Sequence, residues 1–196
     1  MSAIILTGGK SKRMGYDKTS ILLNDSLLIE KTISSLKVVF PDIIVCGKLF
    51  KDNHNEDIRY VEDIFIDAGP IGGIFSGLYY SNDDINFIIA CDIPDINTNI
   101  IEYMKKSAQS YDAVILQING YYEPLFGFYS KRTLPIFKTC IENGIYKITE
   151  AFKSMKMRII CEDELKKIVP TFQGLYNINT KDDLIEYKNR KIKIVT

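Results

Sequence analysis

The sequence predicts one three-layer α/β/α domain, Rossmann-like, built on a mostly parallel sheet. Two observations lead to this fold class. Apolar, β-branched runs of strand length recur along the chain, and segments whose apolar residues have helical spacing lie between most of them. Strand followed by helix, repeated, is typical of βαβ units and a parallel sheet. The 196 residues are 46% apolar, enough for one core, and no linker, repeat or low-complexity segment divides residues 1–196.

The expected strands follow the uninterrupted apolar runs. The first run, AIILT, ends directly before a pair of glycines, and the fourth, NFIIAC, ends directly before an aspartate. Strands of a parallel sheet are covered on both faces, so they show no polar alternation. The strands are expected at 3–7, 42–46, 58–62, 86–91 and 112–117, with shorter ones near 125–129, 156–161 and 191–195.

The expected helices lie between these runs. In the first of them, at 26–39, Leu28, Ile29 and Leu36 fall on one face, and Asp25 and Ser26 are the candidates for its N-cap. The other helices are expected at 74–81 and 96–108, and near 131–143, 146–155 and 180–189.

Composition excludes several classes of protein. The net charge is zero, so no overall basic field attracts the chain to nucleic acid or to a membrane surface. No apolar run reaches the length of a membrane-spanning helix, and MSAIILTGG does not have the form of a signal peptide. The four cysteines are far apart in the sequence and are expected to be free thiols. A cytoplasmic protein without nucleic-acid or membrane partners is expected.

The segment after the first strand, LTGGKSKRMGYDK, has the composition of a phosphate-binding loop. Gly8 and Gly9 let the backbone approach a ligand closely, and exposed backbone N–H groups can form a concave anion site. Positive side chains follow at Lys10, Lys12, Arg13 and Lys18. In a doubly wound sheet this loop lies at the ligand crevice, outside the carboxyl ends of the strands.

Spacing excludes two better-known phosphate loops. A Walker loop needs Gly-Lys-Ser/Thr, whereas Gly15 is followed here by Tyr16 and Asp17, and the glycines do not fit G-x-G-x-x-G. A glycine turn followed by a solvated basic loop is the plainer alternative. The preceding strand and the Gly15-Tyr16-Asp17-Lys18 segment favour a polyphosphate-binding loop over it.

Several blocks of the sequence together resemble the molybdenum cofactor guanylyltransferases. LTGGKSKRMGYDK is similar to that family's nucleotidyltransferase signature, L-A-G-G-x-S-x-R-M-G-x-D-K. DAGPIGGI at 67–74 is similar to its G-P-L-A-G-I, and IIACDIPDI at 88–96 to its C-D-x-P strand end. YEPLFGFY at 122–129 and FQGLYNINTKDDL at 172–184 resemble its Q-P-L-F-A-L-Y and F-x-N-I-N-T-P-E-D-L. The blocks occur in the family's order and span almost the whole chain.

The resemblance implies a fold of the nucleotidyltransferase type, similar to glycosyltransferase A, and an activity. The chain would transfer GMP from GTP to the terminal phosphate of molybdopterin or molybdenum-molybdopterin, with release of pyrophosphate and use of Mg²⁺. Proteins of the same pathway that deliver the pterin are expected partners. The alternatives are a cytidylyltransferase, acting on molybdopterin or another small phosphorylated acceptor, and a nucleotide-binding module without turnover.

The resemblance also implies the roles of particular residues. Arg13, Lys18 and Asp92 would be catalytic. The nucleotide would be bound by Leu6, Thr7, Gly8, Gly9, Lys18, Asp63, Gly73 and Asp92. Asp67 is a rival of Asp63 for the contact near the base or ribose.

Asp92 is the candidate metal ligand, because it ends an apolar run and would point into the crevice, and hard cations such as Mg²⁺ need oxygen ligands. A turn or cap aspartate is the alternative there, and a loop aspartate is the alternative for Asp63. Gly69, Gly72 and Gly73 have two equally good explanations. They could allow close approach of the backbone to a nucleotide, or they could form a tight turn before a helix that starts near Ile74.

Two departures from the family's pattern bear on the site. The segment VCGK at 45–48 stands where the family has an Asn-rich segment, which puts one expected base contact in doubt. Glu123 stands where the family usually has Gln.

Overall fold

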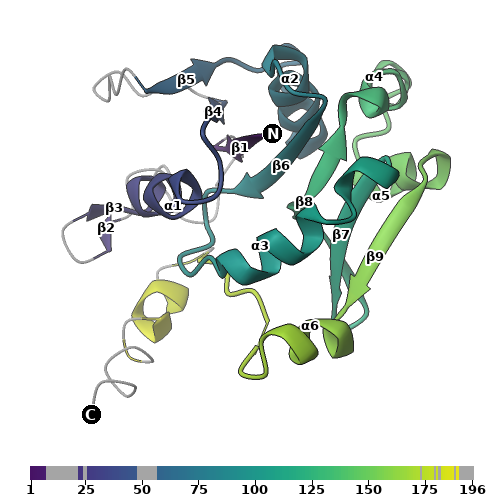
Figure 1. Cartoon of the computed structure of the whole chain (residues 1–196). Coiled ribbons are helices and arrows are strands. Elements are labelled where there is room, and N and C mark those ends of the chain that lie inside the picture. Colours follow the sequence, from purple (N-terminus) through teal and green to yellow (C-terminus); the bar gives the residue numbers. More distant parts are fainter. Residues whose placement is uncertain are drawn as a thin grey trace.

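A sheet of seven described strands, in the order β5-β4-β1-β6-β8-β7-β9, forms the centre of the computed structural model (Figure 1). The structure describes residues 1–7, 22–23, 26–47, 57–172, 174–178, 180, 182–187 and 189. The strands are β1 (Ser2–Leu6), β4 (Ile43–Cys46), β5 (Ile58–Val61), β6 (Ile85–Ala90), β7 (Ala113–Ile118), β8 (Tyr121–Ser130) and β9 (Met157–Cys161). Only β8 among them runs antiparallel to its neighbours, so the expected mostly parallel sheet is confirmed.

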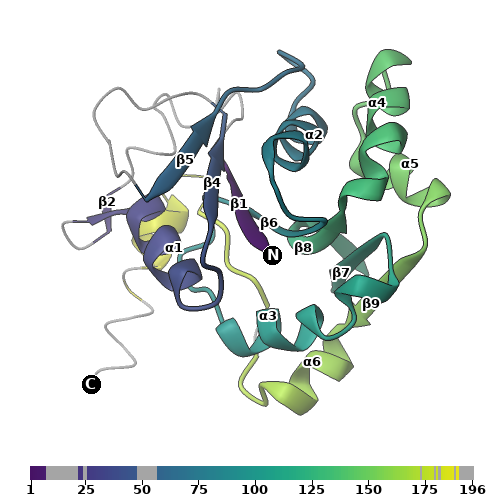
Figure 2. The ribbon, with the colours of Figure 1, turned by 45° about the horizontal axis from the view of Figure 1, so that its top comes forward.

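Helices cover both faces of the sheet and give the expected three layers (Figure 2). One face carries α1 (Leu28–Lys37), α3 (Thr98–Lys105) and α6 (Glu162–Ile168). The other carries α2 (Pro70–Tyr80), α4 (Leu134–Glu142) and α5 (Ile148–Ala151). Successive residues of β1 enter opposite layers, because Ile4 and Leu6 pack on the α2 side whereas Ala3 and Ile5 pack on the α1 side.

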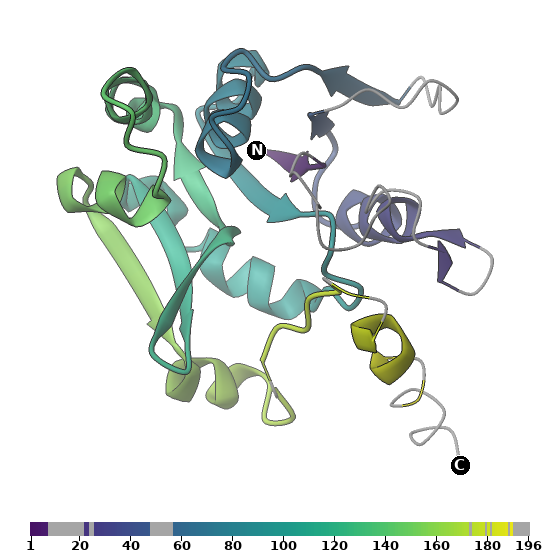
Figure 3. The same ribbon diagram turned by 180° about the vertical axis from the view of Figure 1, so that it is seen from behind.

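A smaller apolar cluster joins residues 23–28 to the carboxy-terminal segment at 178–187. The short strands β2 (Leu22–Leu23) and β3 (Ser26–Leu27) form an antiparallel pair directly before α1. Leu23 and Leu28 pack there with Ile178 and Tyr187, the latter from a helical segment at 182–187 (Figure 3). This packing brings the carboxy-terminal segment beside the first third of the chain.

Most of the expected elements are confirmed, with shifted boundaries. The apolar runs at 3–7, 42–46, 58–62, 86–91 and 112–117 are strands β1, β4, β5, β6 and β7. The N-cap assignment to Ser26 is wrong: Ser26 pairs in β3, the N-cap is Leu27, and the Glu30 carboxylate accepts a hydrogen bond of 3.0 Å from the Leu27 N–H. Helix α6 and the pair β2–β3 were not expected from the sequence. Asp25 and the strand expected at 191–195 lie outside the described residues.

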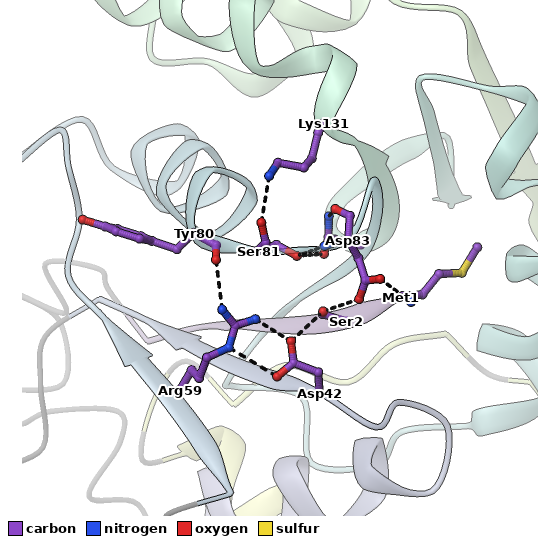
Figure 4. Close-up of polar contacts among 9 residues, drawn as sticks. Met1, Ser2, Asp42, Arg59, Tyr80, Ser81, Asp83 and Lys131 are labelled. Atoms are coloured by element: carbon purple, nitrogen blue, oxygen red, sulfur yellow. Dashed lines mark hydrogen bonds and ion pairs between the residues drawn. The ribbon is translucent and has the colours of Figure 1, made fainter.

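A polar network ties together the amino-terminal ends of the strands, opposite to the carboxyl edge (Figure 4). The Ser2 hydroxyl lies 2.8 Å from Asp42 Oδ2 and 2.6 Å from Asp83 Oδ2, between the two carboxylates. Arg59 Nε donates to Asp42 Oδ1 at 3.3 Å, and Nη1 donates to the Tyr80 carbonyl at 3.0 Å. The members of this network come from β1, the turn before β4, β5 and the end of α2. The network therefore holds these strands in place relative to one another, and the arrangement of their carboxyl ends depends on that.

Among the residues that the structure describes, helices of the length and apolarity that a membrane crossing requires do not occur.

Candidate functional site

The connections of the sheet create a switch point between β1 and β6. From β1 the chain proceeds to β4 and β5 on one side, and helix α2 then returns it to β6 on the other side of β1. Helices α1 and α2 lie on opposite faces, so the carboxyl ends of β1 and β6 open between them. Ligands of doubly wound sheets bind at such points.

Hydrogen bonds to backbone carbonyls fix the end of β1 on both sides. The Thr7 N–H and hydroxyl both donate to the Cys46 carbonyl, at 2.9 and 3.1 Å. On the other side the Cys91 N–H donates to the Leu6 carbonyl at 3.1 Å. The Leu6 side chain is buried against α2, so this residue has only its backbone to offer a ligand at the edge.

Asp63 lies just beyond β5 and is held by the end of β4. The Cys46 thiol lies 3.5 Å from Asp63 Oδ1 and 3.5 Å from the Gly73 carbonyl. Burial raises the pKa of the Asp63 carboxyl, and the hydrogen bond from Cys46 partly offsets that increase. Asp63 is a half-buried carboxylate that contacts the end of β4.

Helix α2 begins at Pro70, earlier than the start near Ile74 that the sequence predicted, so Gly72 and Gly73 lie inside its first turn. Gly69 is the N-cap, with φ of 68° and ψ of −153°, a conformation open essentially to glycine alone. A Cβ on Gly72 would lie 2.9 Å from the Phe65 carbonyl oxygen, and one on Gly73 would lie 3.3 Å from Leu6 Cδ2. These two glycines permit close packing of the helix, and the tight-turn explanation holds only for Gly69.

Ser76 connects α2 to the loop that carries Asp63. Its hydroxyl accepts a hydrogen bond of 2.8 Å from the Ile64 N–H and donates one of 2.8 Å to the Gly72 carbonyl. The side chain is fully buried. Asp67, the rival of Asp63, has a positive φ of 62° in the same loop.

Asp92 lies in the turn after β6, whose last residue is Ala90, so it follows the strand and does not end it. Its side chain is buried, and its carbonyl accepts a hydrogen bond of 2.8 Å from the Ile178 N–H. Burial, and after it the charge of Asp92, raises the pKa of Glu123, so the two carboxylates are near neighbours.

The carboxy-terminal segment docks onto the same turn. Besides the bond from Ile178 to Asp92, the Tyr187 hydroxyl lies 2.9 Å from Asp95 Oδ1. Thr180 and Asp183 cap the helical segment at 182–187 reciprocally, since Thr180 N–H donates to Asp183 Oδ2 at 2.8 Å and Asp183 N–H to Thr180 Oγ1 at 3.1 Å. The last resembling block thus meets the block that contains Asp92.

Within the described ranges, three or more His, Cys, Asp or Glu side chains nowhere gather as a metal-binding group. Asp92 and Glu123 nevertheless offer two oxygen-donor carboxylates. Mg²⁺ usually takes one or two protein carboxylates together with phosphate oxygens and water, so this donor set suits Mg²⁺ when a nucleotide is bound.

The structure thus brings Leu6, Thr7, Asp63 and Gly73 together and places Asp92 in the turn after the adjacent strand β6. Gly8, Gly9, Arg13 and Lys18 lie outside the described residues. Sequence reasoning missed the contacts of Cys46 and Ser76, and it noted Glu123 only as a departure. The sequence offered no signal for the last of these, because the proximity of Glu123 to Asp92 depends on the order of the strands in the sheet.

Comparison with known proteins agrees with this arrangement. Residues 3–156 match the family model described as the MobA-like NTP transferase domain. A probable molybdenum cofactor guanylyltransferase from Peptoclostridium acidaminophilum is 33% identical over 95% of this chain and 87% of its own length. A molybdenum cofactor guanylyltransferase from Syntrophotalea carbinolica is 29% identical over 96% and 91% of the two chains.

Solved structures are similar in fold. The molybdopterin-guanine dinucleotide biosynthesis protein A of Archaeoglobus fulgidus superposes with a TM-score of 0.85 at 24% identity, covering 98% of this chain and 100% of that one. The 4-diphosphocytidyl-2C-methyl-D-erythritol synthase of Anaerococcus prevotii superposes with a TM-score of 0.72 at 16% identity, covering 98% and 95%. At these identities the similarity concerns the fold.

Proposed function

This chain belongs to the family of MobA-like NTP transferases, and from this premise we propose that it is a molybdenum cofactor guanylyltransferase. It transfers GMP from GTP to the terminal phosphate of molybdopterin, or of molybdenum-molybdopterin, and releases pyrophosphate. The relatives named above, of which the first is 33% identical over nearly the whole chain, support this reaction.

The observation that carries the proposal is the meeting of four resembling blocks at one edge of the sheet. The ends of β1 and β6 are adjacent there, and the loop with Asp63 and the first turn of α2 lie on their α2 side. The carboxy-terminal block is bonded to the turn that holds Asp92. These segments are far apart in the sequence, so an unrelated α/β protein would not bring them together.

In this proposal the nucleotide lies across the end of β1. The backbone of Leu6 and Thr7 lies against it, and Gly73 lets the first turn of α2 pack closely on Leu6 beside it. Asp63 accepts hydrogen bonds from the guanine edge or the ribose. Gly8 and Gly9 hold the phosphates, while Lys18 and Arg13 neutralise the charge that develops on the departing pyrophosphate. The roles of these last four residues rest on the resemblance of the loop.

Asp92 and Glu123 would hold Mg²⁺. When bound, this ion would supply positive charge that stabilises the negative charge of the phosphates. The acceptor phosphate is ionised at neutral pH, so this chain needs no general base for the attack. Its residues contribute by holding the acceptor phosphate and the α-phosphate of GTP in the orientation that in-line attack requires.

Replacement of Asp92 tests the site and the metal together. We expect Asp92→Asn to lower turnover by roughly 10²–10³-fold, the scale of losing one electrostatic stabiliser, with an unchanged melting temperature. Asp163→Asn, which alters an exposed carboxylate on α6, is the matched control. Mn²⁺ binding followed by EPR gives a readout that does not require turnover. Normal turnover and Mn²⁺ affinity in the Asp92 variant would refute the assignment.

Two further parts of the proposal concern the surroundings of the enzyme. We place the reaction in the cytoplasm and expect partner proteins of the same pathway to deliver the pterin.

A further inference from the structure

Cys46 occupies the centre of the residues that are proposed to bind the nucleotide. It is the last residue of β4 and is paired in register with Leu6 of β1. Its carbonyl accepts both hydrogen bonds from Thr7, and its thiol lies 3.5 Å from Asp63 Oδ1 and from the Gly73 carbonyl. One side chain and its carbonyl therefore link the ends of β1 and β5 to the first turn of α2.

The buried thiol of Cys46 is available as a hydrogen-bond donor. Cys46 is 1% exposed, so neither solvent nor a bulky reagent reaches it. Burial, and then the negative charge of Asp63, raises the pKa of the Cys46 thiol, which keeps its proton at physiological pH. The thiol has one proton and two acceptors at 3.5 Å, and the charged carboxylate of Asp63 is a stronger acceptor than the Gly73 carbonyl.

We propose that Cys46 is a positioning residue for the nucleotide, because its thiol fixes the direction in which the Asp63 carboxylate faces the base or ribose. The proposal rests on the proposed function, in which Asp63 contacts the nucleotide. The proposal also accounts for the sequence VCGK in place of the family's Asn-rich segment. An Asn amide could contact the base directly, whereas Cys46 orients the neighbouring carboxylate of Asp63, which makes the contact.

The donor property separates this role from simple packing. Cys46→Ala removes the donor, whereas Cys46→Ser keeps a small side chain with one hydroxyl donor. We expect Cys46→Ala to weaken GTP binding by roughly three- to tenfold, the scale of losing one modest hydrogen bond, and to change kcat less than twofold. We expect Cys46→Ser to restore most of the affinity.

The control for packing is Ile44→Val, which removes one buried methylene group from the same strand and the same apolar layer. It should lower the melting temperature and leave GTP affinity unchanged. If Ile44→Val and Cys46→Ala weaken GTP binding equally, or if Cys46→Ser binds GTP no better than Cys46→Ala, the positioning role is refuted.

A double-mutant cycle gives the decisive test. GTP affinity is measured by calorimetry with Mg²⁺ present and without acceptor, for Cys46→Ala, Asp63→Ala and the double variant. We expect the double variant to bind GTP as weakly as Asp63→Ala alone, since Cys46 acts through Asp63. Additive losses, or an Asp63→Ala variant of normal affinity, would overturn the inference. Absence of GMP transfer by a wild-type protein that binds GTP would count against the proposed function alone.

Discussion

Ser76→Ala should loosen the loop that holds Asp63 while leaving α2 in place. The hydroxyl of Ser76 accepts a hydrogen bond of 2.8 Å from the N–H of Ile64, which is the residue directly after Asp63. Alanine is close in volume and suits a helix, so the change removes the hydrogen bond without opening a sizeable cavity. The Ile64 N–H then loses this partner in a partly buried position.

The cost follows from that lost bond. Leaving a partly buried amide unsatisfied costs about 1–2 kcal/mol, which in a chain of this length lowers Tm by about 2–8 °C. Because Asp63 is adjacent to the released amide, KM for GTP should rise several-fold while kcat stays close to that of the wild type.

Thr32→Val is the matched control, measured by the same thermal melts and GTP titrations. Thr32 is a buried hydroxyl in α1 that donates only to the Leu28 carbonyl of its own helix, at 3.1 Å. Its replacement should lower Tm by less than about 2 °C, because that carbonyl remains bonded within the helix. Equal losses in the two variants, or an unchanged KM for GTP in Ser76→Ala, would refute the connection between Ser76 and the site.

Three further predictions test the fold and the loop. Gly77→Ala should destabilise the protein by about 1–3 kcal/mol in chemical denaturation, since its Cβ would lie 2.4 Å from a buried side chain of β1; unchanged stability would contradict this packing. Hydrogen bonds from Arg59 and Ser2 outweigh burial and hold the pKa of Asp42 below its ordinary value of 3.8, so its stabilisation is present above that pH and is lost as the pH falls through the lower folded pKa. The free-energy difference between wild type and Asp42→Asn should therefore shrink as the pH falls below 3.8, and a constant difference would refute the pairing. Lys18→Ala should weaken triphosphate binding and turnover more than Lys12→Ala, whereas equal effects at several salt concentrations would indicate only a diffuse positive field.

The strands were predictable because parallel strands are buried on both faces and therefore appear as unbroken apolar runs, as AIILT and NFIIAC do. The start of α2 was not, because glycines suggest a turn when only local propensity is considered. Gly72 and Gly73 are tolerated within the helix since α2 lies too close to the Phe65 carbonyl and to Leu6 for side chains there. Only the tertiary packing reveals that reason.

The candidate site was predictable from the sequence to a similar extent. Asp92 and Asp63 follow apolar runs, so their places at the carboxyl edge follow from the strand assignment. Cys46 appears in the sequence only as a small apolar residue, because its partner Asp63 comes 17 residues later. The proximity of Glu123 to Asp92 depends on β8 being antiparallel to β6, and the sequence contains no signal for that order of strands.

The nucleotide preference tests the central claim most directly. Purified protein is incubated with molybdopterin and Mg²⁺, and kcat/KM is measured for GTP and CTP through pyrophosphate release and formation of the dinucleotide product. Guanine presents two donors on one edge, and cytosine lacks that pair. A carboxylate such as Asp63 could accept from both, and each lost bond costs roughly 1–3 kcal/mol. We expect GTP to be preferred by roughly 10²–10³-fold. A value for CTP equal to or above that for GTP would contradict guanylyl transfer and make the protein a cytidylyltransferase of the same fold.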